Sequence, residues 1–90
     1  MAVVMIGEVP GLTAEVYNGM LGGLKPTMLA AKGFIAHSGG PSPEGGWRVI
    51  EMWDSEADGQ AWFDAYVAPN LPPDIVPRRT YHEVDAAFSK

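Results

Sequence analysis

Short apolar runs, separated by glycine, proline and polar residues, predict four strands along the chain. Runs rich in apolar and β-branched residues predict strands over 2–6, 34–38, 47–53 and 80–88. The third run, Trp47 to Trp53, carries the strongest strand signal because aromatic and branched side chains crowd it. The last run is more polar, which is typical of a strand near the edge of a sheet.

Apolar residues spaced three and four apart predict a first helix that begins after Thr13 as the N-cap. Its stripe consists of Val16, Tyr17, Met20, Leu21 and Leu24. Pro26 should end or kink this helix, because its ring clashes with the carbonyl of residue 22. A further turn from Met28 to Ala31 is expected, with Gly33 as its stop.

A capping box marks the start of a second helix, because Ser55 is followed three residues later by Asp58. The apolar stripe that follows consists of Gly59, Trp62, Phe63, Tyr66 and Val67. Pro69 should stop the helix, and a proline-rich connection leads to the last strand.

The order of elements is therefore β-α-β-β-α-β, which predicts a ferredoxin-like α+β fold in one domain over 1–90. In that fold both helices lie on one face of an antiparallel four-stranded sheet. The segment 39–46 is interpreted as a loop that joins two adjacent strands, because glycine and proline dominate it.

Strand residues of both parities are apolar in Val3 to Ile6. The third strand repeats this, with Trp47, Val49 and Trp53 on one parity and Ile50 and Met52 on the other. A solitary sheet with one open face should alternate between apolar and polar positions. A chain of 90 residues without cysteine also has no disulfide to compensate for a small core. The pattern predicts a homodimer in which two sheets pack face to face and the helices lie outside.

Charge and composition exclude several classes of function. Six Lys and Arg against eleven Asp and Glu give a net charge of −5, which disfavours nucleic acid and membrane surfaces as partners. The absence of cysteine excludes thiol catalysis and thiolate metal sites and fits a cytoplasmic location. No signal peptide or membrane span is recognised, and no metal site is expected from only two histidines.

Several segments together resemble the dimeric α+β barrel superfamily and, within it, antibiotic biosynthesis monooxygenase-like proteins. They are Gly33-Phe34-Ile35-Ala36-His37, Gly45-Gly46-Trp47-Arg48-Val49 and Trp53-Asp54-Ser55-Glu56 before an aromatic helix. The resemblance spans nearly the whole chain and implies a dimeric barrel with a ligand cavity between sheet and helices. Members that bind haem carry an Asn on the first strand and a His after the helix Trp, and this chain has neither, so no cofactor is expected.

His37 and Glu51 are the candidate catalytic residues. If odd positions of the third strand face the helices, Glu51 stands among large apolar neighbours, where a carboxylate can serve as a general acid or base. His37 lies near a strand end, and an imidazole exchanges protons at physiological pH. The alternatives are that Glu51 faces solvent or pairs with an arginine, that His37 is structural, and that His82 belongs to a surface or interface.

Five aromatic residues are the candidates for binding a flat substrate: Tyr17, Trp47, Trp53, Trp62 and Tyr66. The alternative is that they only pack the core. Neither a nucleophilic serine motif nor a phosphate-binding loop is present.

Three functions follow as hypotheses. The first, which the resemblance implies, is a cofactor-independent monooxygenase for a small aromatic or polyketide-type compound. The second is an isomerase or cyclase that uses the same pocket without redox chemistry. The third is a dimeric ligand-binding protein without catalytic activity.

Overall fold

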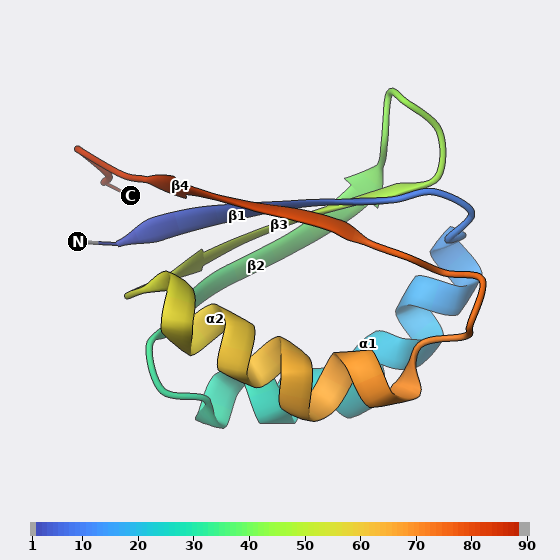
Figure 1. Cartoon of the computed structure of the whole chain (residues 1–90), viewed down its shortest axis with the longest axis horizontal. Coiled ribbons are helices and arrows are strands. Elements are labelled where there is room, and N and C mark those ends of the chain that lie inside the picture. Colours follow the sequence, from blue (N-terminus) through green and yellow to red (C-terminus); the bar gives the residue numbers. More distant parts are fainter. Residues whose placement is uncertain (1, 89–90) are drawn as a thin grey trace.

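A computed structural model describes residues 2–88 of the chain, and in it four strands form one antiparallel sheet in the order β2-β3-β1-β4. The strands are β1 (Val3–Val9), β2 (Phe34–Pro41), β3 (Trp47–Trp53) and β4 (Arg78–Glu83). Both helices lie on the same face of the sheet (Figure 1). The predicted ferredoxin-like arrangement is confirmed.

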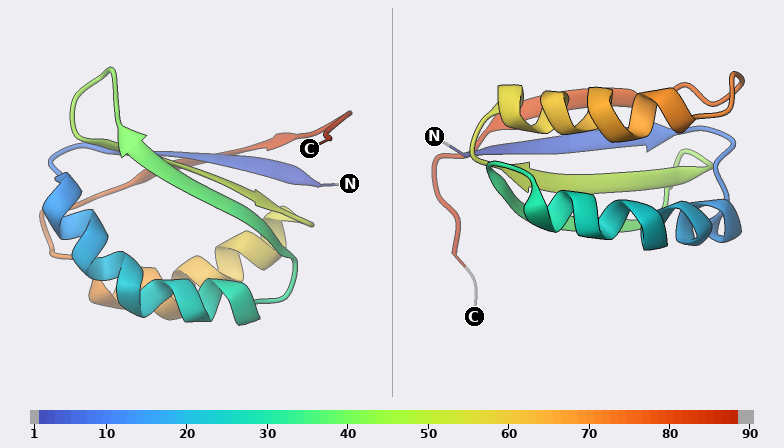
Figure 2. Two further views of the ribbon diagram at one scale, coloured as in Figure 1. Left: turned by 180° about the vertical axis from the view of Figure 1, so that it is seen from behind. Right: turned by 90° about the horizontal axis from the view of Figure 1, so that it is seen from below.

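Helix α1 (Ala14–Ala30) is capped as predicted, since the Thr13 hydroxyl accepts a hydrogen bond from the amide of Val16. The expectation that Pro26 could end the helix is wrong, because α1 continues through it. The helix bends along its length instead (Figure 2). Val16 also departs from the predicted stripe, since it is exposed.

Helix α2 (Glu56–Trp62) begins at the predicted capping box, where the Ser55 hydroxyl accepts from the amide of Asp58 at 3.1 Å. It runs into a π-helical turn, η1 (Phe63–Val67), and a 3₁₀ turn, η2 (Ala68–Asn70), that includes the expected stop at Pro69. The π turn places residues five apart on one side. Trp62 and Val67 are therefore both buried, whereas Tyr66 is turned out to 46% exposure.

Strands β2 and β4 end at other residues than predicted, because pairing with the neighbouring strand decides where each one ends. Strand β2 runs to Pro41, three residues into the segment predicted as a loop, because Gly39 to Pro41 still pair with β3. The loop that remains turns at Gly46, whose φ of 74° and contact with the backbone of Val9 and Pro10 suit glycine. Strand β4 ends at Glu83 and not at Phe88, because its partner β1 begins at Val3.

The core lies between the sheet and the helices. Met5 and Trp53 are fully buried there, and the other buried apolar residues are Val9, Leu12, Met28, Trp62 and Val67. Figure 2 shows α1 running beside β2 and β3 and α2 beside β1 and β4. The odd positions of β1, β3 and β4 face the helices, which settles the parity that the sequence left open.

The opposite face of the sheet carries no helix among residues 2–88 (Figure 1). Val4, Ile6, Ile50 and Met52 form a band of apolar residues across its two central strands. Within the same described range, no helix has the length and apolar character needed to cross a membrane.

Candidate functional site

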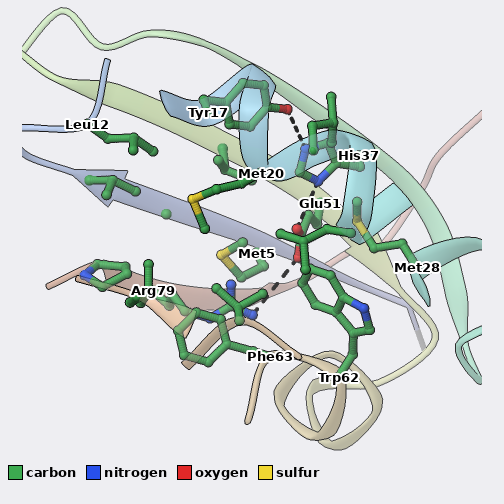
Figure 3. A pocket seen from close by; sticks show the side chains of 18 residues that line it. Met5, Leu12, Tyr17, Met20, Met28, His37, Glu51, Trp62, Phe63 and Arg79 are labelled. Atoms are coloured by element: carbon green, nitrogen blue, oxygen red, sulfur yellow. Dashed lines mark hydrogen bonds and ion pairs between the residues drawn. The ribbon is translucent and has the colours of Figure 1, made fainter. Parts of the chain in front are cut away.

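A small cavity of about 80 Å³ lies between the sheet and the two helices. Its wall is mostly apolar, and includes Met5, Leu12, Met20, Leu24, Phe63 and Val67. Four polar side chains interrupt this wall: Tyr17, His37, Glu51 and Arg79 (Figure 3). They come from α1, β2, β3 and β4, so the cavity gathers polar groups from four separate elements.

A β-bulge brings His37 to the inner face of the sheet. Between Phe34 and Ala36 the register of β2 shifts, so that Phe34 lies opposite Trp53 while Ala36 lies opposite Met52. In a regular strand, residues three apart point to opposite faces. The extra residue, Ile35, allows both Phe34 and His37 to face the helices, and His37 then lies directly opposite Glu51.

Tyr17, His37 and Glu51 form one hydrogen-bonded row (Figure 3). The Nδ1 of His37 lies 2.9 Å from Oε2 of Glu51, and the Oη of Tyr17 lies 2.6 Å from Nε2 of His37. An ionised carboxylate only accepts hydrogen bonds, so Nδ1 carries a proton. In the neutral ring Nε2 is then the acceptor, and the Tyr17 hydroxyl donates to it. His37 therefore presents a basic nitrogen that a phenol already occupies.

Glu51 is 2% exposed, and its partners explain how a carboxylate lies there. One oxygen accepts from the indole of Trp53 at 3.0 Å, and the guanidinium of Arg79 approaches the same oxygen at 3.9 Å. The other oxygen accepts from His37. A buried charge is retained where hydrogen bonds and an opposite charge surround it. Glu51 therefore orients His37 and is itself held in place by its neighbours.

Arg79 occupies the side of the cavity opposite α1. Its guanidinium lies 4.0 Å from the centre of the Phe63 ring and donates to the Tyr81 hydroxyl at 2.9 Å. Its Nε is buried and has no hydrogen-bond partner among the described residues. A buried guanidinium N–H without a partner is a site where an oxygen-bearing ligand can be recognised.

Burial raises the pKa of the Tyr17 hydroxyl above its ordinary value of 10.0, and the nearby charge of Glu51 acts in the same direction. Burial also raises the pKa of Tyr81, although its hydrogen bond to Arg79 opposes this effect. Tyr17 therefore remains a neutral phenol throughout the physiological range and acts as a donor to His37.

The predicted substrate-binding aromatics divide into three groups. Tyr17 and Trp62 line the cavity, and the Trp62 indole donates to the Thr27 hydroxyl at 2.9 Å. Trp47 packs on Tyr17 with ring centres 5.0 Å apart, and Trp53 lies beneath Glu51, so both support the site from outside the lining. Tyr66 does not line the cavity, because the π turn directs it toward solvent.

His82 and Arg79 lie on opposite faces of the sheet. His82 pairs with Val4 on the outer face of the sheet, so it does not meet His37 and Glu51. Arg79 is the arginine that approaches Glu51, and it also lines the cavity, a role that the sequence did not predict. The alternation of β4 could have indicated this, because Arg79 and Tyr81 share the parity that faces the helices.

Comparison with solved structures finds the same architecture in oxygenases. No protein-family model matches the sequence, and no curated protein matches it. SnoaB, a cofactor-independent oxygenase from Streptomyces nogalater, superposes with a TM-score of 0.72 at 8% identity over 99% of this chain and 98% of SnoaB. A point variant of SnoaB gives a TM-score of 0.73 at 9% identity with the same coverage.

The chain has the fold of these oxygenases. A protein from Shewanella loihica PV-4 named a putative monooxygenase shares it, with a TM-score of 0.67 at 15% identity over 96% of both chains. The expectation that this chain shares the fold of small monooxygenases is thus confirmed at the level of architecture. At these identities the likeness shows the fold alone.

Proposed function

We propose that this protein is a cofactor-independent monooxygenase that acts on a small, electron-rich aromatic or polyketide-type compound. The observation that carries the proposal is the row of Tyr17, His37 and Glu51 beside an apolar cavity. The oxygenases with the same fold support the general kind of chemistry. The apolar lining of the cavity and the rings of Tyr17, Trp62 and Phe63 support the proposed substrate class.

His37 is the proposed general base, and Glu51 is its positioning residue. The carboxylate holds Nδ1 protonated, directs Nε2 toward the cavity and stabilises the imidazolium that forms when Nε2 takes a proton. The Tyr17 hydroxyl already occupies Nε2 in the way that a substrate hydroxyl or an acidic C–H would. A substrate must displace this phenol to react, so Tyr17 competes with it for the base.

The reaction balances without a cofactor when the substrate carries a methylene activated by aryl and carbonyl groups. His37 removes one proton to give a delocalised carbanion, and one electron passes from the carbanion to O2. The resulting radical and superoxide combine to form a C–O bond, and the imidazolium returns the proton to give a hydroperoxide. Elimination of water breaks the O–O bond and leaves a ketone, so CH2 and O2 become C=O and H2O.

Arg79 and the ring of Trp62 have supporting roles in this scheme. The free Nε of Arg79 can donate to the oxygen on which the carbanion's charge is delocalised. Trp62 supplies an aromatic wall fixed by its bond to Thr27. The apolar lining keeps water away from the carbanion and from superoxide.

Oxygen uptake with a panel of hydroxylated anthrones and phenols, in the presence of a metal chelator, tests the proposal. We expect one O2 consumed per substrate and a loss of activity in both His37→Ala and Glu51→Gln. Since a positioned general base contributes 10²–10⁴-fold, each variant should fall by roughly that factor. Turnover that persists under strict anaerobiosis would instead identify an isomerase or cyclase, and ligand binding without turnover would refute catalysis.

We further propose that the outer face of the sheet packs on a second copy of the chain. Ile50, on the central strand β3, is 40% exposed on this face, beside the half-buried Ile6. Sedimentation velocity should show about twice the chain mass of 9.6 kDa for the wild type. Ile50→Glu should give the single-chain mass, because it would bury a charge between two sheets. A wild type that sediments as one chain at micromolar concentration would refute the dimer.

A further inference from the structure

A second hollow lies outside the cavity, in an open groove between α1 and the edge strand β2. Its volume is about 650 Å³. Helix α1 contributes Lys25 and Leu29 to it, and β2 contributes Phe34, Ala36 and Ser38. Leu29 is 66% exposed, so the groove presents apolar surface to solvent.

The groove and the cavity share a wall. Four residues line both hollows: Tyr17, Leu21, Met28 and His37. The hydrogen bond between the Tyr17 hydroxyl and Nε2 of His37 belongs to this shared wall. A ligand in the groove therefore lies against the same two polar side chains that face the cavity, on their other side.

Size favours a ligand that uses both hollows. Sites for small organic ligands usually measure about 300–1,000 Å³. The inner cavity, at about 80 Å³, has room for only a handful of water molecules. The groove, at about 650 Å³, falls within the usual range. A multi-ring aromatic ligand fits only if most of it lies in the groove.

Charge in the groove comes from Lys25. The three arginines form ion pairs outside the groove. Arg48 and Arg78 pair with Glu44, and Arg79 pairs with Glu51. Lys25 makes no ion pair with any of residues 2–88. It lies two helical turns beyond Tyr17 on α1, about 12 Å along the axis, a span comparable to the long axis of a fused three-ring aromatic.

We infer that this groove is an outer subsite for an aromatic ligand that carries a carboxylate or similar anionic substituent, which Lys25 binds. The ring system lies along α1 and reaches Nε2 of His37 when the Tyr17 hydroxyl leaves it. The last step rests on the proposed function, since it assigns His37 as the base. Binding in the groove does not depend on turnover.

The test compares two probes, anthracenecarboxylate and the neutral anthracenemethanol, on the full chain. Dissociation constants come from quenching of tryptophan fluorescence, and the binding position comes from methyl NMR. The Leu29 methyls report on the groove alone, whereas those of Leu12 and Val67 report on the cavity alone. Lys25→Met keeps the aliphatic stem and removes the charge. Lys32→Met, an exposed lysine outside the groove lining, is the matched control.

We expect the carboxylate to bind about 2–5-fold more tightly than the alcohol, as for a solvent-accessible ion pair. Lys25→Met should abolish this preference and Lys32→Met should retain it, with Leu29 shifting in the wild type. Equal affinities, a preference that survives Lys25→Met, or shifts confined to Leu12 and Val67 would overturn the inference. Leu29 shifts that follow protein concentration alone would assign the groove to contact between copies and also overturn it. Failure of the oxygen assay would leave these binding results unaffected.

Discussion

Replacing Tyr17 by Phe removes one hydroxyl and keeps the ring that packs on Trp47. The lost interaction is the 2.6 Å hydrogen bond to Nε2 of His37. A hydrogen bond between uncharged partners contributes about 0.5–1.5 kcal/mol net to stability. Because Tyr17 is partly buried, Tyr17→Phe should lower the free energy of unfolding within that range, as measured by urea denaturation.

The same change should improve substrate binding. In the wild type the substrate must displace the phenol from Nε2, and in Tyr17→Phe this competition is absent. Since 1.36 kcal/mol corresponds to a tenfold change, the same energy lowers KM by about 2-fold to 13-fold. The kcat should stay within a few-fold of the wild type, because the hydroxyl takes no proton in the reaction.

Steady-state oxygen uptake across a range of substrate concentrations separates these two constants. A KM in Tyr17→Phe equal to or above the wild-type value would refute the idea that Tyr17 competes with substrate. A large fall in kcat would show instead that the hydroxyl contacts the reacting atoms.

Three further predictions concern stability and ionisation. Hydrogen bonds from Ser42 and Arg48 lower the pKa of Glu8 below 4.5, so its contribution to stability is present above about pH 4.5 and is lost as the pH falls through the lowered pKa. Urea denaturation should therefore show Glu8→Gln less stable than the wild type near pH 7, with the difference shrinking below pH 4.5; a constant difference would contradict this. Gly46→Ala should destabilise by more than about 1 kcal/mol, because the added Cβ would meet the carbonyl oxygen of Val9 at a positive φ, whereas Gly40→Ala has open space and should be nearly neutral. Equal stabilities of the two alanine variants in thermal denaturation would refute that reasoning. The phenolate absorbance of Tyr17, taken as the difference between wild type and Tyr17→Phe, should reach half of its final value only above pH 10, because burial raises the pKa of this phenol, and a midpoint below pH 10 would contradict this reasoning.

The sequence predicted the order of elements because the spacing of apolar residues and the glycines and prolines between them are local properties. Thr13 and Ser55 both cap their helices as expected, and the strand from Trp47 to Trp53 has the predicted bounds. The end of α1 was less predictable. A proline inside a helix carries an energetic cost but does not require the helix to end, and α1, which packs on β2, continues through Pro26.

The site was predictable in its members and not in its geometry. Glu51 and His37 stood out as polar residues among apolar ones, but their facing the same side depends on a bulge at Ile35 that no sequence signal marks. The prediction that Tyr66 binds substrate assumed a regular α-helix. The spacing of apolar residues does not distinguish an α-helix from a π turn here, and the π turn directs Tyr66 toward solvent. Pairing across strands decides which way His37 faces, the π turn decides which way Tyr66 faces, and local periodicity predicts neither.

The rate of oxygen uptake by His37→Ala, relative to the wild type at saturating substrate, tests the central claim most directly. If Nε2 of His37 removes the proton that starts the reaction, the variant should lose at least about 100-fold in kcat, equivalent to about 2.7 kcal/mol, and added imidazole should restore part of the rate. A variant that consumes oxygen as fast as the wild type would contradict the account.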